Sequence, residues 1–294
     1  MKRHLPSLAV ILAGCLWGVI NIFVKTLSAA GLSPLQIALG RLAAATVIFS
    51  VFLLLRSPGS FKIDGKDLWM FVGTGIVSVV LFNLCYFYTM IRGQASIAVV
   101  LLYTSPVFVM LLSAVLFKEA ITPRKLTALI LTFAGCVFVS GLITGKPAVT
   151  PLVFLSGIAA GLLYALYTIF GRYALAKYDT NTVTVYTFIL AFLASLCIGD
   201  APGLLGAVKA DPSLIGWIIG LAVVSTVLPY YLYTWGLQRM ESGKAALLVA
   251  VEPVVGAAVG MTVFREPHEL LKLLGIALII AAIAVLNTGP QEKN

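Results

Sequence analysis

The sequence has little charge for its length. Only 11% of its 294 residues are charged, against about a quarter in an average soluble protein. It has 2 histidines and 4 cysteines, and none is spaced like a metal site. It contains neither a glycine-rich nucleotide loop nor a catalytic serine motif. These absences argue against a soluble catalytic domain, so any chemistry has to take place within or between helices.

Apolar sequence takes the place of the missing charge. The chain is 61% hydrophobic, and its mean hydropathy is +1.06. We therefore expect an all-α integral membrane protein with the lipid bilayer as its surroundings. In a soluble protein the net charge of +9 would suggest a nucleic-acid partner. Here we attribute it to lysines and arginines that hold loops on the cytoplasmic side, and we expect no nucleic acid.

Ten apolar segments suit transmembrane helices, for which about 20 residues are needed. They cover residues 5–25, 34–56, 67–91, 95–117, 124–143, 151–175, 179–198, 213–238, 243–264 and 268–286. The first is interpreted as a retained helix, because its apolar run continues to Phe23 without a small-residue cleavage pattern. With the N-terminus inside, most lysines and arginines fall on its side, which predicts cytoplasmic N- and C-termini.

An internal repeat is visible when the chain is aligned with itself. Pro106 and Pro253 are 147 residues apart, and the same shift pairs Phe117-Lys118-Glu119 with Phe264-Arg265-Glu266. We expect the two Lys/Arg-Glu pairs to make an ion pair or a helix cap at a tight hairpin. The predicted domains are residues 1–147 and 148–294. Each holds five helices, an odd number, so the second enters the membrane from the opposite side, as in secondary transporters.

Glu252 is the residue that fits an apolar segment least well. It lies near the middle of residues 243–264, directly before Pro253, and its counterpart in the first repeat is Ser105. An ionisable group at that depth costs several kcal/mol, about 3 kcal/mol on insertion scales, unless it faces a partner or a watery cavity. One interpretation is a carboxylate held by packing alone. The other is a counterion for a substrate ammonium, or a proton carrier.

Arg41 and a set of aromatic and amide residues complete the candidate substrate site. Arg41 lies within the second segment, where it either extends outward to the interface or binds a carboxylate, of Glu252 or of a substrate. The predicted lining of a central cavity is Trp17, Asn21, Asn83, Tyr86, Tyr103, Tyr164 and Tyr231. An apolar cavity with a few polar groups is typical of a small-molecule site. We expect no cofactor beyond a coupled proton.

The sequence resembles the EamA family of the drug/metabolite transporter superfamily. The resemblance rests on the twin blocks SPVFVMLLSAVLFKEAITPRKLTALILTFAGCVFV and EPVVGAAVGMTVFREPHELLKLLGIALIIAAIAVLN, with AGCLWGVINIFVKTL and IALGRLAAA near the start. It implies ten helices as two inverted five-helix repeats around a central cavity, lined mainly by helices 1, 3, 4, 6, 8 and 9. It also implies a bacterial inner-membrane location. Similar members export amino acids, aromatic ones among them, or other metabolites, while others take up solutes.

The function predicted from these features is secondary active transport, most simply amino-acid export by alternating access. The alternative is an uptake or efflux carrier for organic cations or other small metabolites. A membrane-embedded enzyme or lipid-handling protein would need paired acids or a histidine cluster, and neither is present. An inverted repeat with one asymmetric acid fits a carrier with a gated site better than it fits a channel. A single chain suffices to build the cavity, so a monomer fits the sequence.

Overall fold

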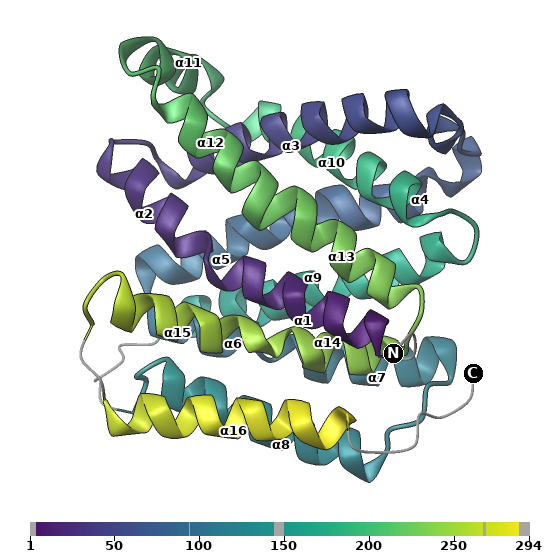
Figure 1. Cartoon of the computed structure of the whole chain (residues 1–294), viewed down its shortest axis with the longest axis vertical. Coiled ribbons are helices and arrows are strands. Elements are labelled where there is room, and N and C mark those ends of the chain that lie inside the picture. The colour runs from purple at the N-terminus through teal and green to yellow at the C-terminus, as the bar shows by residue number, and fades with distance from the viewer. Residues whose placement is uncertain (1–3, 94, 144–149, 267–268, 288–294) are drawn as a thin grey trace.

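The structure is a computed structural model that describes residues 4–93, 95–143, 150–266 and 269–287. All regular secondary structure within these ranges is helical. Figure 1 shows the long helices running side by side between two ends of the molecule. We call the end where the first helix begins the N-terminal end, and the other the opposite end. The predicted all-α class is confirmed for the described residues.

The helices of the first half are α1 (Leu5–Gly18), α2 (Ile20–Ala29), α3 (Pro34–Arg56), η1 (Pro58–Phe61), η2 (Gly65–Asp67), α4 (Leu68–Val72), the π-helix η3 (Gly73–Leu81), α5 (Phe82–Arg92), α6 (Ala95–Leu102), α7 (Ser105–Phe117) and α8 (Pro123–Val139). Those of the second half are α9 (Pro151–Leu175), α10 (Thr180–Ile198), α11 (Ala201–Ala210), α12 (Leu214–Ala222), the π-helix η4 (Val223–Val227), α13 (Leu228–Leu237), α14 (Ser242–Leu248), the 3-10 helix η5 (Val249–Val251), α15 (Glu252–Thr262) and α16 (Leu270–Asn287).

Within the described ranges, 9 helical stretches are long and apolar enough to cross a membrane. They correspond to nine of the ten predicted segments. The remaining segment, 124–143, forms α8, which has 17 residues and is shorter than the roughly 20 residues of a typical span. The connection after the seventh segment contains α11, a helix that was not predicted. The predicted domain boundary at 147/148 lies outside the described residues.

Side-chain caps fix where several helices begin. The Ser33 hydroxyl accepts from the Gln36 amide at 3.3 Å, and the Gln36 side chain accepts from the Ser33 amide in return, before α3. The Thr122 and Thr150 hydroxyls cap α8 and α9 by accepting from the Lys125 and Val153 amides, and each threonine is followed by a proline at the first helical position. Capping residues followed by proline satisfy the free amides of a first turn. The three helices begin within one residue of the predicted segments, which start at 34, 124 and 151.

Several local features recur at a separation of 147 residues. The break between α6 and α7 precedes Pro106, and η5 precedes Pro253. Lys118 and Arg265, after α7 and α15, both have positive φ, at 58° and 55°. The third and eighth predicted segments both contain a π-helix, η3 and η4. The α1/α2 break at Val19 has no equivalent in α9, which is continuous over 25 residues.

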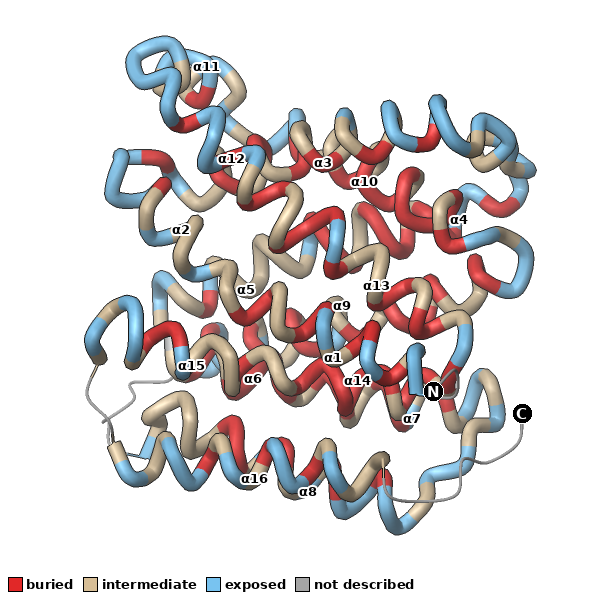
Figure 2. Tube along the Cα trace, in the orientation of Figure 1, coloured by how far each residue is buried: buried red, intermediate tan, exposed pale blue. Residues whose placement is uncertain are grey.

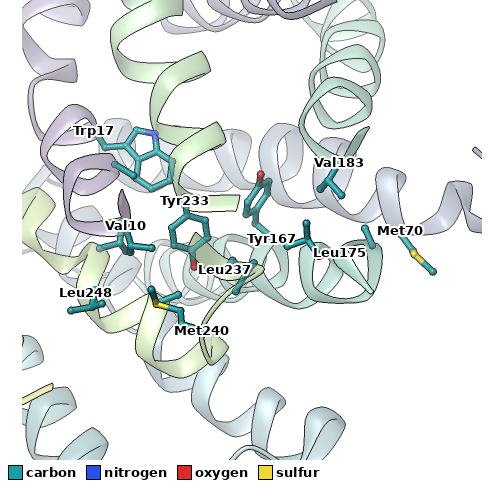
Figure 3. Close-up of a cluster of buried hydrophobic side chains, with 14 of the residues drawn as sticks. Val10, Trp17, Met70, Tyr167, Leu175, Val183, Tyr233, Leu237, Met240 and Leu248 are labelled. Carbon is teal, nitrogen blue, oxygen red and sulfur yellow. The ribbon is translucent and has the colours of Figure 1, made fainter. Parts of the chain in front are cut away.

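The N-terminal end is closed by a buried apolar cluster. Trp17, Tyr167 and Tyr233 belong to it, together with Leu237 and Met240 (Figure 3). Two hydroxyl pairs join α9 to α13, from Tyr167 to Thr234 at 2.8 Å and from Thr168 to Tyr233 at 2.7 Å. At the same end the Arg172 guanidinium, on α9, donates to the carbonyls of Leu237 and Met240, both at 3.0 Å. The ends of α9 and α13 are therefore fixed together.

The loops at the N-terminal end are joined by polar contacts. Lys177 forms an ion pair with Asp67 at 2.7 Å, and the Tyr178 hydroxyl donates to the same carboxylate at 2.7 Å. The hydrogen bond to Asp67 raises the pKa of Lys177. Figure 2 shows that buried residues concentrate on the central helices α9, α13 and α14, whereas α8 and α16 lie at one edge and are more exposed. Helices of the sixth, eighth and ninth segments, which were expected to face the centre, thus lie in the interior, and α10, of the seventh segment, is also largely buried.

Candidate functional site

Glu252 lies where the ninth apolar segment is broken. The chain leaves α14, passes through the 3-10 helix η5 and begins α15 with Glu252 and the buried Pro253. A negative charge in a first turn is stabilised by the helix dipole by roughly 0.3–1 kcal/mol. That is less than the several kcal/mol that a charge in the hydrocarbon core costs. The helix end alone therefore does not account for the acid.

The Glu252 side chain faces hydroxyl groups from several helices. The Tyr103 hydroxyl lies near its carboxylate and interacts with it. Its charge also acts on Tyr86, Tyr164 and Tyr230, which come from α5, α9 and α13. Among the ion pairs of the described residues, none involves Glu252. We therefore find a partly buried acid near several phenolic hydroxyls, and no cation of the described residues forms an ion pair with it.

Helix α1 packs directly on this break. A Cβ added at Gly14 would lie 2.7 Å from the Val249 carbonyl oxygen, and one at Gly18 would lie 2.7 Å from that of Glu252. Only glycine allows two backbones to approach so closely. The end of α1 is therefore held against the residue that bears the carboxylate. Trp17, between these two glycines, turns its indole toward α13 instead.

Arg41 is a second charge of the interior, and none of the ion pairs among the described residues involves it. Its Nε atom is buried and has no acceptor among the described residues. The guanidinium acts electrostatically on Tyr230. No ion pair with Glu252 is formed, so of the two carboxylates considered for Arg41, that of Glu252 is not its partner in this structure. The carboxylate of a substrate stays a prediction.

Tyr230 is a neighbour of both charged residues, and it was not among the predicted lining residues. The charges of both Arg41 and Glu252 act electrostatically on the Tyr230 hydroxyl. Its ring contacts Trp17 at 5.2 Å between centroids, nearly perpendicular, and Tyr167 at 5.2 Å. Tyr231, the predicted member of this pair, turns toward Phe49 at 6.0 Å. Neighbours on a helix point about 100° apart, so only one of the two can face the centre.

The remaining predicted residues divide into two groups. Tyr86, Tyr103 and Tyr164 lie around Glu252 as described above, and Trp17 lies beside Tyr230. Asn21, on α2, is exposed. Asn83 donates to the Val79 carbonyl at 2.7 Å and lines a small pocket between α3, α5 and α10. The structure therefore brings together the aromatic residues more closely than the two asparagines.

The small pocket beside Asn83 is mostly apolar. Its other lining residues are Leu35, Ala38, Leu42, Val80, Leu84, Phe87, Ser195, Ile198 and Gly199. It has room for about one water molecule, so it does not accommodate a metabolite in this conformation. The described residues contain no group of three or more potential metal ligands. In chemical terms, a carboxylate such as that of Glu252 can bind a cation and a guanidinium such as that of Arg41 can bind an anion, and both charges act on the Tyr230 hydroxyl.

Known proteins resemble this chain over nearly its whole length. An uncharacterized transporter of Archaeoglobus fulgidus is 29% identical over 270 residues, covering 92% of this chain and 94% of that protein. The pseudopaline exporter CntI of Pseudomonas aeruginosa is 27% identical, covering 95% of each chain. One solved structure matches with a TM-score of 0.79 over 96% of each chain at 17% identity, a likeness that concerns the fold alone.

The family match falls on both halves of the chain. The EamA-like transporter family matches residues 5–141 and again residues 151–288. The two matches leave out only the two ends and the segment between α8 and α9, which includes the predicted domain boundary. They agree with the family resemblance that the twin blocks indicated. The chain therefore belongs to the EamA-like transporter family and is a multi-pass membrane protein.

Proposed function

We propose that this transporter is a secondary active carrier that exports amino acids, or similar small zwitterionic metabolites, across the bacterial inner membrane. Both termini would be cytoplasmic, as the distribution of lysine and arginine indicates. A relative that is named as an exporter supports the direction of flux. The proposal extends the family assignment to a substrate class, a direction and a site.

The paired features of the two halves support alternating access. Gly14 packs on the Val249 carbonyl oxygen, and its counterpart Gly161 packs near that of Leu102; a Cβ added at each glycine would lie 2.7 Å and 3.4 Å from these oxygens. Helix α1 begins at the end where α9 finishes, because Pro6 and Arg172 both lie against the end of α13. We infer ten helices, with α8 as the fifth, in two inverted repeats that rock about a site between them.

The substrate site is proposed to lie around Glu252. The single observation that carries this proposal is the Glu252 carboxylate, which lies beside a helix break near tyrosine hydroxyls and has no ion pair within the described part of the chain. A substrate ammonium would supply that cation, and the rings of Tyr103, Tyr164 and Trp17 would enclose the apolar body. Asn21, Asn83 and Tyr86 stay proposed members of the lining, and Tyr230 takes the place that was predicted for Tyr231.

Arg41 narrows the substrate class. An arginine with a buried, unpaired Nε atom is costly unless a ligand satisfies it. A substrate carboxylate can bind the planar guanidinium through two hydrogen bonds. One zwitterion would then neutralise two residues that do not neutralise one another. If Arg41 instead remains unpaired during transport, the aromatic faces around Glu252 favour the alternative substrate, an organic cation without a carboxylate.

Counterflow in proteoliposomes tests the proposal. Vesicles loaded with an unlabelled amino acid should accumulate the labelled one transiently, with saturation and with competition by related zwitterions. Organic cations without a carboxylate serve as the comparison. Substrates are first chosen by thermal unfolding, because a ligand that binds the folded state raises its melting temperature. Flux that rises linearly with concentration and shows no competition would indicate a channel and would contradict the carrier.

A further inference from the structure

The turns that follow α7 and α15 have the same backbone geometry at opposite ends of the molecule. Lys118 and Arg265 are the only described non-glycine residues with positive φ. The next residue folds back in both turns: the Glu119 amide donates to the Ser113 carbonyl at 3.2 Å, and the Glu266 amide donates to that of Gly260 at 3.0 Å. Each turn therefore presents a glutamate side chain at one end of the bundle.

At the N-terminal end, Glu119 holds the start of α14. Its two carboxylate oxygens accept from the amides of Ser242 and Gly243 at 2.8 and 3.1 Å. This confirms the predicted cap for the first of the two Lys/Arg-Glu pairs. Next to it, the buried Lys125 ammonium pairs with Glu241 at 2.7 Å. Charge-assisted bonds of this kind are about twice as strong as neutral ones, so the end of α7 is fixed to the start of α14.

At the opposite end, Glu266 has different partners. It faces the ammonium groups of Lys272 at 3.5 Å and Lys25 at 3.7 Å, and its side chain is 42% exposed. The residue that corresponds to Gly243 after the 147-residue shift is Ser96, on α6. The described contacts of Glu266 do not include the Ser96 amide. The second glutamate therefore lacks the contact that its counterpart makes.

The surroundings of the two glutamates differ in the same sense. On the side of Glu119, Tyr233 and Met240 are only 4% and 7% exposed; both are drawn in Figure 3. Toward the Glu266 side, Asn21 is exposed and α15 is partly exposed from Val254 to Ala257. Both ends contain buried apolar residues. We call the end with the capped glutamate the closed end, because Met240 is buried there and Glu119 holds a helix start, whereas the Glu266 carboxylate pairs with lysines.

We propose that Glu119 and Glu266 are alternating latches of the two gates. In this conformation the Glu119 latch is closed on α14 and the Glu266 latch is open, its carboxylate held by lysines. In the reverse conformation Glu266 binds the Ser96 amide at the start of α6, and Glu119 is released to Lys125. This inference rests on the proposed alternating access but does not depend on the identity of the substrate.

Cysteine accessibility tests the latches without a substrate. Two reporters, Met240→Cys at the closed end and Asn21→Cys toward the other, are placed in a full-length chain whose four native cysteines have been replaced. A charged thiol reagent labels the protein in lipid nanodiscs. Glu119→Gln, Glu266→Gln and the loop control Asp211→Asn are compared in each reporter background, and thermal unfolding reports whether each variant is folded.

Without either substitution, Asn21→Cys should react faster than Met240→Cys. Loss of one charged hydrogen bond shifts an equilibrium roughly tenfold, so Glu119→Gln should accelerate Met240→Cys by about that factor and slow Asn21→Cys. Glu266→Gln should not accelerate Met240→Cys, and Asp211→Asn should match the parent. Changes in the same direction for both glutamates, or a merely lower melting temperature with unchanged labelling, would overturn the latches. Because labelling needs no substrate, this result is independent of whether amino acids are transported.

Discussion

Arg41 and Glu252 both act on the hydroxyl of Tyr230, yet they do not form an ion pair with one another. Opposite charges in a medium of low dielectric attract strongly, so two such groups usually pair when the fold allows it. Here the fold keeps them apart, with Tyr230 as their shared neighbour. A site of this kind is suited to a ligand that carries both charges.

Replacing Arg41 should separate stability from transport. Arg41→Met removes a charge whose Nε atom lacks a partner, so the melting temperature should stay the same or rise. Loss of a charged hydrogen bond costs about 1.5–3 kcal/mol, which predicts a rise in KM of roughly ten- to a hundredfold for carboxylate-bearing substrates. Flux measurements with an amino acid and with the matching amine check this. Equal losses for both substrates would contradict a role in carboxylate binding.

Tyr230 should affect affinity through its hydroxyl. Tyr230→Phe keeps the ring that contacts Trp17 and Tyr167 but removes the group between the two charges. One neutral hydrogen bond is worth about 0.5–1.5 kcal/mol, so KM should rise severalfold while the melting temperature hardly changes. Tyr231→Phe is the matched control, because its ring faces Phe49. If the control raises KM more than Tyr230→Phe does, the assignment of Tyr230 to the site fails.

Gly18 should be required for the contact between α1 and the helix break. A Cβ there would lie 2.7 Å from the Glu252 carbonyl oxygen and 2.6 Å from the Val255 Cβ. Overpacking of this kind typically costs about 1–3 kcal/mol, so Gly18→Ala should lower the melting temperature and the flux. Gly216→Ala, in α12, meets no atom within 4 Å and serves as the control. A Gly18→Ala protein as stable and active as the control would show that α1 need not pack so closely.

The sequence was sufficient for the parts of the structure that depend on single unusual residues. Glu252, directly before Pro253, was the residue that fitted its apolar segment least well, and the ninth segment is broken there. The glutamates after Lys118 and Arg265 indicated a special turn, and both turns have positive φ. Such residues are informative because a charge or a proline does not occur in an apolar helix without a specific structural or functional role. The predicted helix ranges also agree closely, since long apolar runs end at charges, prolines and glycines.

The orientation of each helix could not be predicted in the same way. A membrane helix is apolar on all sides, so no polar face indicates which side points inward. This is why Tyr231 was chosen over Tyr230, and why Asn21 was placed in the lining although it is exposed. The π-helices η3 and η4 also have no clear sequence signal, yet they rotate the residues that follow them. Helix α8 lies where the fifth segment was predicted and differs from the prediction only in its length of 17 residues.

The most direct test of the account is amino-acid counterflow by Glu252→Gln in proteoliposomes at several pH values, with Asp211→Asn as the control. Glutamine has nearly the same shape but cannot bind an ammonium as a counterion or carry a proton. We expect a folded variant with the melting temperature of the parent that has lost counterflow, or whose counterflow no longer depends on pH. Flux and pH dependence equal to those of the parent would contradict the central role of Glu252.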